Sequence, residues 1–210
     1  MSKDLSNKTL GIIHAAVFTA QTVQKYIDEI IPEVSVLHLG DDSIQRDNLR
    51  APIGTIPKTN YFKFVTYARF LEEAGADLIM LGCSTFNRAV EMDLAVRDGR
   101  RIGLLATLAM TVPSSERLLR LAASEAGREV EITTVLSTEA FNVLRAGNPQ
   151  KHNEMLLEEI DKLSRKVDAI VMAQVSMSVL EPQLKNTRVP VYNSGRTGFA
   201  RAREILESLP

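Results

Sequence analysis

The chain has 210 residues, which is long enough for one domain or for two small lobes with a sizeable core. Hydrophobic residues make up 45% and charged residues 24% of it, an ordinary balance for a soluble globular protein. The formal net charge of −1 gives no sign of a nucleic-acid-binding or membrane-binding surface, and no apolar run reaches the ~18 residues of a membrane span.

Short apolar runs alternate with amphipathic segments along the chain. The apolar runs predict buried strands at residues 10–15, 34–39, 78–81, 101–106, 130–136, 168–173 and 189–192. Helical patterns lie at residues 20–31, 61–74, 88–96, 113–126, 138–145, 149–166 and 197–206, and a short helix is expected from Ser176 to Pro182. Strands and helices that alternate in this way predict an α/β fold with mainly parallel sheets.

The longest polar stretch covers residues 40–60 and contains Pro52, Gly54 and Pro57. It shows no clear apolar period, so we expect a long loop there. Loops of this length inside compact domains often serve as lids or binding loops.

Two segments of the first half recur in the second half. Residues 10–19 (LGIIHAAVFT) resemble residues 102–111 (IGLLATLAMT), with Gly11 and Gly103 92 positions apart. Residues 76–83 resemble residues 167–174, with Asp77 and Asp168 91 positions apart. Because both pairs share nearly one offset, we expect two pseudo-symmetric α/β lobes that face a shared cleft.

The same repeat suggests where the lobes begin and end. We expect residues 1–99, completed by residues 186–210, to form the first lobe, and residues 100–185 to form the second. In this frame Gln174 lies opposite Cys83.

The stretch around Cys83 has features of a reactive site. Cys83 follows the predicted strand 78–81 at its carboxyl end, where open α/β sheets bind ligands. Ser84 and Thr85 are good N-cap residues for the next helix, and a thiol beside a helix N-terminus becomes more acidic. A packed and inert cysteine is the alternative, because free cysteine is among the most buried residue types.

The number of cysteines and the absence of known binding motifs indicate the cellular compartment and the cofactor requirement. A single cysteine cannot form an internal disulfide, and residues 1–9 lack the apolar core of a signal peptide, so we expect a cytoplasmic protein. The sequence has no Cys/His cluster with zinc spacing, no GxxxxGK(S/T) and no GxGxxG. We therefore expect no metal and no cofactor.

These features resemble the aspartate/glutamate/hydantoin racemase superfamily over nearly the whole chain. The resemblance rests on the doubled plan, on residues 76–85 (ADLIMLGCST) and on residues 103–107 (GLLAT). It implies a cofactor-independent enzyme whose two lobes hold a small carboxylate or amino-acid substrate. In such enzymes a thiol from each lobe faces one side of the reacting carbon. The resemblance also implies a homodimer.

Carried onto this sequence, the resemblance implies that Cys83 is one acid/base catalyst. The residues that it implies as carboxylate holders are hydroxyl side chains that follow the strands: Ser84, Thr85, Thr107 and Thr111. Ser176 can supply a further hydroxyl, and His14 can reach the cleft from the end of the first strand. For His14 a role in the core is the alternative.

Gln174 stands where the family has its second cysteine. An amide has no titratable proton in the useful range and cannot act as a general base. The residue at this position therefore does not fit a racemisation that uses two bases. Three functions stay open: a racemase-like isomerase that acts through Cys83, a single-cysteine lyase of the decarboxylase type, and a non-catalytic protein that binds small carboxylates.

Overall fold

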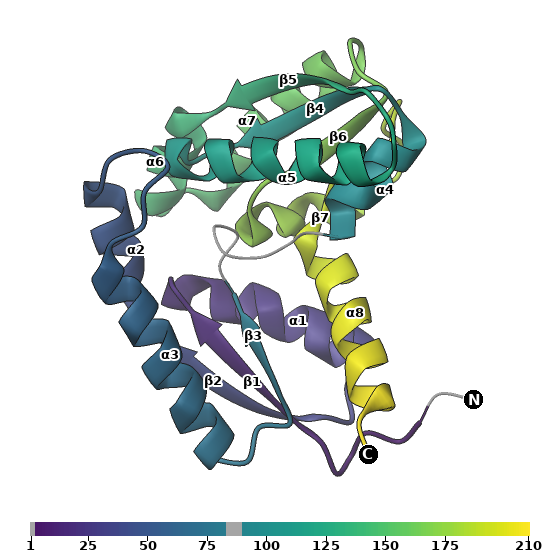
Figure 1. Cartoon of the computed structure of the whole chain (residues 1–210). Coiled ribbons are helices and arrows are strands. Elements are labelled where there is room, and N and C mark those ends of the chain that lie inside the picture. Colours follow the sequence, from purple (N-terminus) through teal and green to yellow (C-terminus); the bar gives the residue numbers. More distant parts are fainter. Residues whose placement is uncertain (1–2, 83–89) are drawn as a thin grey trace. The chain divides into compact units, whose positions relative to one another are not determined.

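The computed structural model describes residues 3–82 and 90–210 of the chain (Figure 1). Cys83, Ser84 and Thr85 lie outside the described residues. The chain divides into two compact units, Met1–Asn87 with Gly195–Pro210 (unit 1) and Arg88–Ser194 (unit 2). No helix in the described ranges is long and apolar enough to cross a membrane.

Unit 1 is built on a parallel sheet with the strand order β2-β1-β3. Its strands are β1 (Thr9–His14), β2 (Ser35–Gly40) and β3 (Leu78–Leu81). Its helices are the short 3-10 turn η1 (Val17–Thr19), α1 (Ala20–Ile30), α2 (Asp42–Arg50), α3 (Lys58–Glu73) and all but the first residue of α8 (Ser194–Ser208). Helices α2 and α3 cover one face of the sheet, and α1 and α8 cover the other (Figure 1).

Unit 2 has the parallel strand order β5-β4-β6-β7. Its strands are β4 (Arg101–Ala106), β5 (Glu131–Leu136), β6 (Ala169–Met172) and β7 (Val191–Asn193). Its helices are α4 (Val90–Asp98), η2 (Ala109–Thr111), α5 (Val112–Glu125), α6 (Thr138–Arg145), α7 (Pro149–Ser164) and η3 (Val175–Gln183). One buried apolar cluster joins the sheet to α4 and α5, and a second joins it to α6 and α7.

The seven predicted strands are confirmed, and the repeat predicted from the sequence is seen in the strand register. Gly11 pairs with Ile79 of β3, and Gly103 pairs with Ile170 of β6. Both pairs keep the offset of the repeat. The predicted shared cleft concerns how the two units are placed relative to each other, and it stays a prediction.

The repeated glycines allow a helix to lie close to the central strand. A Cβ added to Gly11 would lie 3.1 Å from Cδ1 of Leu71 in α3, and one added to Gly103 would lie 2.6 Å from Cδ2 of Leu163 in α7. Leu71 and Leu163 are again 92 positions apart, so α3 and α7 are equivalent helices. The contact is tighter in unit 2.

The repeated aspartates fasten the amino ends of the strands. The Asp77 carboxylate accepts from the Thr9 N–H at 2.7 Å, and the Asp168 carboxylate accepts from the Arg101 N–H at 2.9 Å. In return, each aspartate N–H donates to the carbonyl of the same partner, at 2.8 and 2.7 Å. The Arg101 side chain and backbone hydrogen bonds lower the pKa of Asp168 to about 2, so this carboxylate stays charged.

A second pair of equivalent hydrogen bonds ties neighbouring helices together. Nδ2 of Asn60 in α3 donates to the carbonyl of Ile44 in α2 at 3.2 Å. Nδ1 of His152 in α7 donates to the carbonyl of Ala140 in α6 at 2.8 Å. Asn60 and His152 are both buried and 92 positions apart, so the two units repeat this contact with different side chains.

The expected loop at residues 40–60 is wrong in its first half, because α2 begins at Asp42. The Asp41 side chain caps this helix by accepting from the Ser43 N–H at 2.8 Å. The two buried residues of α2 are Ile44 and Asn48, which lie one turn apart. Since one of them is an asparagine, α2 carries too weak an apolar period to be recognised from the sequence.

The predicted lobe boundaries differ from the units at α4 and β7. We expected 1–99 and 186–210 to form one lobe, yet both of these elements belong to unit 2. The reason is packing, because β7 pairs with β6 and Ala95 of α4 is buried in the core of unit 2. From Gly195 onward α8 does belong to unit 1, where its Phe199 stacks on Tyr26 with ring centroids 6.1 Å apart.

The two glycine contacts predict unequal effects of the same substitution. Gly103→Ala should lower the free energy of unfolding by about 1–3 kcal/mol, because Leu163 must move out of a packed core. Gly11→Ala should lower it less, since its neighbours at 3.1–3.2 Å need to shift only slightly. Urea unfolding of both variants measures the difference. Equal losses would contradict the assignment of the tighter contact to unit 2.

Candidate functional site

Buried polar residues stand at the carboxyl ends of three strands in unit 2. Thr107 follows β4, Gln174 follows β6 by two residues, and Asn193 ends β7. All three are buried. Because the strands are parallel, these ends meet at the edge of the sheet where α/β proteins bind ligands. We call Thr107, Thr111, Gln174, Ser178 and Asn193 the polar edge of unit 2.

Gln174 is held at both ends of its amide. Its Oε1 accepts from the Thr107 N–H at 3.2 Å, and its Nε2 donates to Oγ1 of Thr111 at 2.9 Å. The Thr111 hydroxyl in turn donates to the carbonyl of Leu108 at 2.8 Å. Gln174 therefore fastens β6 to the turn that follows β4, which is the neutral hydrogen-bonding role expected when a side chain is 6% exposed.

The structure separates the predicted hydroxyl residues by what their oxygens do. The Thr111 hydroxyl is used in the bonds to Gln174 and Leu108. Thr107 is 1% exposed, and no hydrogen bond to its hydroxyl is found within the described part of the chain. Ser176 lies half-buried in η3. Among the predicted hydroxyl residues of unit 2, Thr107 and Ser176 thus have hydroxyl groups with capacity for a ligand, whereas the hydroxyl of Thr111 is already used.

Ser178 and Asn193 are part of the polar edge that the sequence reasoning missed. The Ser178 hydroxyl donates to Oδ1 of Asn193 at 3.0 Å, and both residues are buried. Asn193 closes a three-residue strand, and Ser178 lies one helical turn beyond Gln174. A polar residue at the end of a short apolar run is the signal that points to Asn193.

In unit 1, His14 takes part in a chain of hydrogen bonds at the end of β1. Its Nε2 lies 2.8 Å from Nδ1 of His38 in β2, and Nε2 of His38 lies 2.8 Å from Oε1 of Gln24 in α1. Gln24 donates through its Nε2 to Asp28 at 2.7 Å. His38 and Gln24 were not predicted as neighbours of His14, and they extend this polar chain to the surface.

The direction of these bonds follows from Gln24. Because its amide nitrogen donates to Asp28, its oxygen accepts from Nε2–H of His38. A neutral His38 then accepts at Nδ1 from Nε2–H of His14. The second nitrogen of His14, Nδ1, is left with a lone pair 3.2 Å from the hydroxyl of Thr19.

Desolvation disfavours the charged form of both imidazoles, most strongly that of the buried His14. Desolvation, and second the nearby His38, lower the pKa of His14 to about 4. Desolvation also lowers the pKa of His38. His14 is 1% exposed, and a Cβ added at Gly82 would lie 3.3 Å from its Nδ1. Nδ1 of His14 therefore lies close to Gly82, the residue that precedes Cys83 in the sequence.

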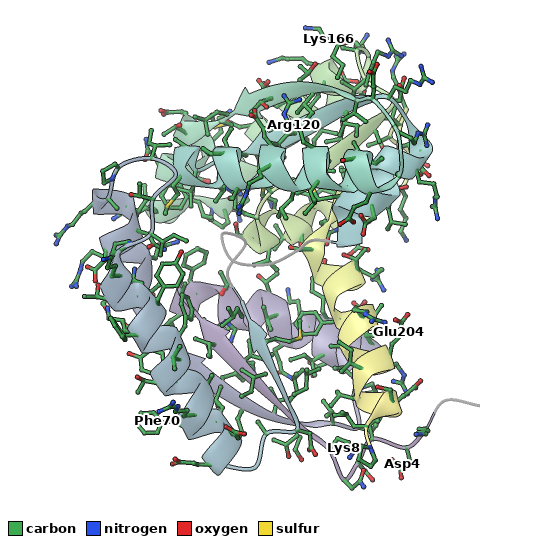
Figure 2. The ribbon with its side chains drawn as sticks, in the orientation of Figure 1. Asp4, Lys8, Phe70, Arg120, Lys166 and Glu204 are labelled. Atoms are coloured by element: carbon green, nitrogen blue, oxygen red, sulfur yellow. The ribbon has the colours of Figure 1, made fainter. Side chains whose placement is uncertain are left out.

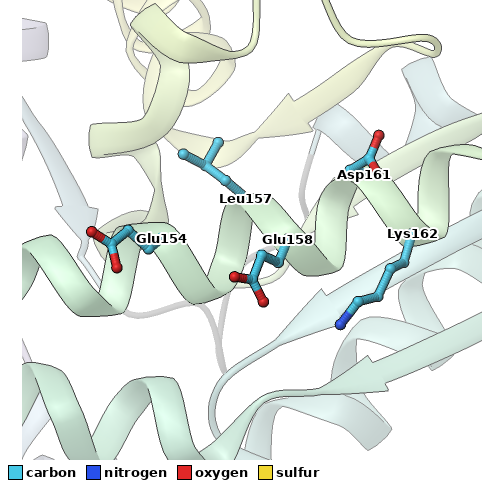
Figure 3. A pocket seen from close by; sticks show the side chains of 5 residues that line it. All are labelled: Glu154, Leu157, Glu158, Asp161 and Lys162. Carbon is cyan, nitrogen blue, oxygen red and sulfur yellow. The ribbon is translucent and has the colours of Figure 1, made fainter.

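A shallow depression elsewhere on unit 2 lacks the features of a substrate site. Its lining residues all lie on the outer side of α7, and four of the five are charged: Glu154, Leu157, Glu158, Asp161 and Lys162 (Figure 3). One face of a single helix offers no convergent polar groups. Within the described residues, no group of three or more metal-binding side chains comes together.

Comparison with known proteins places the chain in a family. The family model described as Asp/Glu/Hydantoin racemase matches residues 88–202, which is more than half of the chain. The chain belongs to this family. The matched stretch includes Thr107, Thr111, Gln174 and Ser176 and begins after Cys83. A search of curated proteins gives no match.

Solved structures of racemases share the fold of this chain. The aspartate racemase of Picrophilus torridus is 18% identical, with a TM-score of 0.68 over 96% of this chain and 100% of that one. A glutamate racemase from Francisella tularensis subsp. tularensis SCHU S4, in complex with D-glutamate, is 16% identical, with a TM-score of 0.66 over 96% and 82%. The allantoin racemase from Klebsiella pneumoniae is 17% identical, with a TM-score of 0.62 over 96% and 87%. The expected racemase-like α/β fold is confirmed.

The low pKa of His14 predicts a loss of stability in mild acid. Above pH 6.5 His14 is neutral in both states, but below it the unfolded chain takes up a proton that the folded chain excludes until about pH 4. From about pH 7.5 to about pH 5 this linkage should remove about 2 kcal/mol from the free energy of unfolding, and His38 acts in the same direction.

Urea unfolding of the wild type and of His14→Asn at both pH values measures this linkage. The variant should lose less stability than the wild type on acidification, since an asparagine does not titrate. If both lose the same amount, His14 is not the group responsible.

Proposed function

We propose that the chain is a cofactor-independent, racemase-like isomerase that acts on a small carboxylate or amino acid through Cys83. The observation that carries the proposal is a sequence position: the chain's only cysteine comes directly after Gly82, and β3 ends at Leu81. The carboxyl ends of strands in parallel sheets are where α/β proteins bind ligands. Family membership supports the racemase type of reaction. The D-glutamate in the Francisella relative supports an amino acid as the substrate class.

The reaction begins with a proton transfer to sulfur. The Cys83 thiolate takes the α-proton of the substrate and becomes a thiol, and the electron pair of the C–H bond passes to the carbanion beside the carboxylate. Ser84, Thr85, Thr107 and Ser176 supply neutral donors to that carboxylate. Hydrogen bonds of this kind stabilise the charge that develops on its oxygens. The reaction ends when a proton returns to the carbon.

Gln174 limits which face of the carbon can receive that proton. Its amide does not titrate, and both of its ends already bond to Thr107 and Thr111. Cys83 therefore acts on one face, and the other face has no acid or base at the position of Gln174. The same one-sided chemistry fits a lyase, in which loss of CO₂ leaves a carbanion that takes the thiol proton.

A non-catalytic carboxylate-binding protein is the second candidate. The observation that favours it is the closed network of Gln174, which holds the Thr107 turn in place without any titratable group. Such a protein would keep the donors that hold a carboxylate and would not exchange the α-proton.

One-sided acid/base chemistry predicts exchange of the α-proton without inversion. In heavy water the wild type should replace the α-proton of one enantiomer with deuterium, while interconversion of enantiomers stays much slower. NMR with chiral analysis over a panel of amino acids and small dicarboxylates measures both rates. Cys83→Ser and Cys83→Ala should lose the exchange, because a thiolate is by far the better base at neutral pH.

Each alternative outcome has a clear reading. Full exchange in the Cys83→Ala variant would remove Cys83 from the chemistry. Fast racemisation by the wild type would show that another residue serves as the second base. Ligand binding without exchange or decarboxylation would favour the binding protein. Gln174→Cys should raise the interconversion of enantiomers, at a loss of about 1–3 kcal/mol of stability from the broken network.

A conservative substitution tests the carboxylate holder of unit 2. Thr107→Val should weaken binding of a carboxylate ligand by about 1–3 kcal/mol, because it removes a donor to a charged group and keeps the backbone bond to Gln174. Thr85→Val is expected to have a similar effect. Thr133→Val, in the middle of β5, is the control and should bind normally. Calorimetry that gives unchanged affinity for Thr107→Val would exclude its hydroxyl from the site.

A further inference from the structure

The turn after β1 exposes two apolar side chains at the carboxyl edge of the unit 1 sheet. Val17 is 47% exposed and Phe18 50%, and both belong to η1. The turn is held against the end of β2: the Val17 N–H donates to Oδ1 of Asp42 at 2.8 Å, and a Cβ added to Gly40 would lie 2.6 Å from Cγ2 of Val17. Exposed apolar side chains at an edge where ligands bind are typical of a pocket for an apolar group.

The charged residues that follow β2 at this edge are acidic. Asp41 and Asp42 come directly after the strand, and Asp42 is exposed. Burial opposes the ionisation of Asp41, but hydrogen bonds, first among them that of Ser43, outweigh it and lower its pKa. Nζ of Lys63 lies 3.8 Å from Oδ2 of Asp41 and 3.2 Å from Oδ2 of Asp47, so its charge is shared between two carboxylates. A carboxylate of a ligand would therefore be repelled here.

The equivalent position of unit 2 carries hydroxyl residues instead. The Asp41 N–H donates to the carbonyl of His14 at 2.9 Å, and the Ser137 N–H donates to the carbonyl of Ala106 at 2.8 Å, so Ser137 takes the place of Asp41. Thr138 follows it, where unit 1 has its second aspartate. The acidic pair is thus a feature of unit 1 and not a requirement of the shared plan.

Basic residues are nearly absent from the segments that follow the strands. In the sequence, the five residues after each of the seven strands include one basic side chain, that of Arg196. Its Nη2 donates to Oε2 of Glu29 at 2.9 Å, and its guanidinium lies 5.9 Å from the ring centre of Tyr26. Arginine is the side chain best suited to pair with a carboxylate through two hydrogen bonds. These segments offer no further base for the side-chain carboxylate of a substrate.

The hydroxyl donors of the proposed site suffice for one carboxylate. The two oxygens of a carboxylate accept about four hydrogen bonds. Thr107 and Ser176 have hydroxyls with capacity in unit 2, and the proposed function adds those of Ser84 and Thr85, which lie outside the described residues. The Thr19 hydroxyl of η1 is used within its own turn. A second carboxylate would leave water without comparable partners, which is costly.

We propose that the substrate carries one carboxylate and an apolar side chain, and that Val17 and Phe18 contact this side chain. The inference rests on the proposed function, because it names the substrate class of the same site. It favours amino acids with aromatic or branched aliphatic side chains over aspartate and glutamate. Phe18 is then a specificity-determining residue: its ring supplies apolar contact area, and Asp42 beside it disfavours a carboxylate.

The first test compares the two substrate classes on the wild-type chain. The kcat/KM for α-proton exchange in heavy water should be at least about tenfold higher for phenylalanine and leucine than for aspartate and glutamate, in whichever enantiomer exchanges. Calorimetry with the same four amino acids should give the same order of affinity. Because binding needs no reaction, calorimetry tests the substrate class separately from the chemistry of Cys83.

Two variants test the residues of unit 1. Phe18→Arg supplies a bidentate donor for a carboxylate, so the preference for apolar amino acids should fall at least about tenfold. Asp42→Asn keeps an oxygen for the Val17 N–H and removes the charge, so it should shift the preference in the same direction. Phe70→Arg is the matched control, since Phe70 is 56% exposed in the C-terminal half of α3, which leads to the amino end of β3 (Figure 2). It should leave the preference unchanged.

The outcomes separate this inference from the proposed function. A wild type that prefers aspartate or glutamate overturns the inference and leaves the proposed function standing. Preferential binding of apolar amino acids without any exchange supports the inference and removes the proposed function. Binding of neither class overturns the inference. An unchanged preference in a folded Phe18→Arg variant, checked by circular dichroism, also overturns it.

Discussion

The aspartate that follows α3 in unit 1 and α7 in unit 2 fixes the strand register on which the rest of each unit depends. Each carboxylate and its own N–H bond the same residue at the amino end of the central strand. A parallel strand cannot then slip by one residue without breaking both bonds. The register from Ile102↔Ala169 to Leu105↔Met172 brings Thr107 level with Gln174, so their hydrogen bond follows from the bonds that Asp168 makes at the opposite edge of the sheet.

The duplication keeps geometry and changes chemistry. Asn60 and His152 hold equivalent helix pairs through different donor groups. Within the described residues the carboxyl edges of the sheets diverge further, because unit 1 carries the buried imidazole of His14 beside the exposed His38, whereas the polar edge of unit 2 consists of amides and hydroxyls.

The parts of the fold that the sequence predicts are those with local signals. Apolar runs predict all seven strands, and the common offset of Gly11 and Asp77 from Gly103 and Asp168 predicts two units of one plan. Helix α2 is not predicted, because one of its two buried positions is the polar residue Asn48. The hydrogen bond that makes its burial possible comes from Asn60, twelve positions away, and local sequence does not show it. The contact of His14 with His38 depends on the register Ile12↔His38, and spacing along one chain does not reveal that.

Because the polar edge of unit 2 is neutral, it affects how the rate of a reaction there would depend on pH. Thr107, Thr111, Gln174, Ser178 and Asn193 have no side chain that titrates, and His14 stays uncharged down to about pH 4. A bell-shaped rate profile requires one group that must lose a proton and another that must keep one. If Cys83 is the single base, the rate should rise with pH along one limb and then level off, so the midpoint of that limb would report the acidity of one thiol.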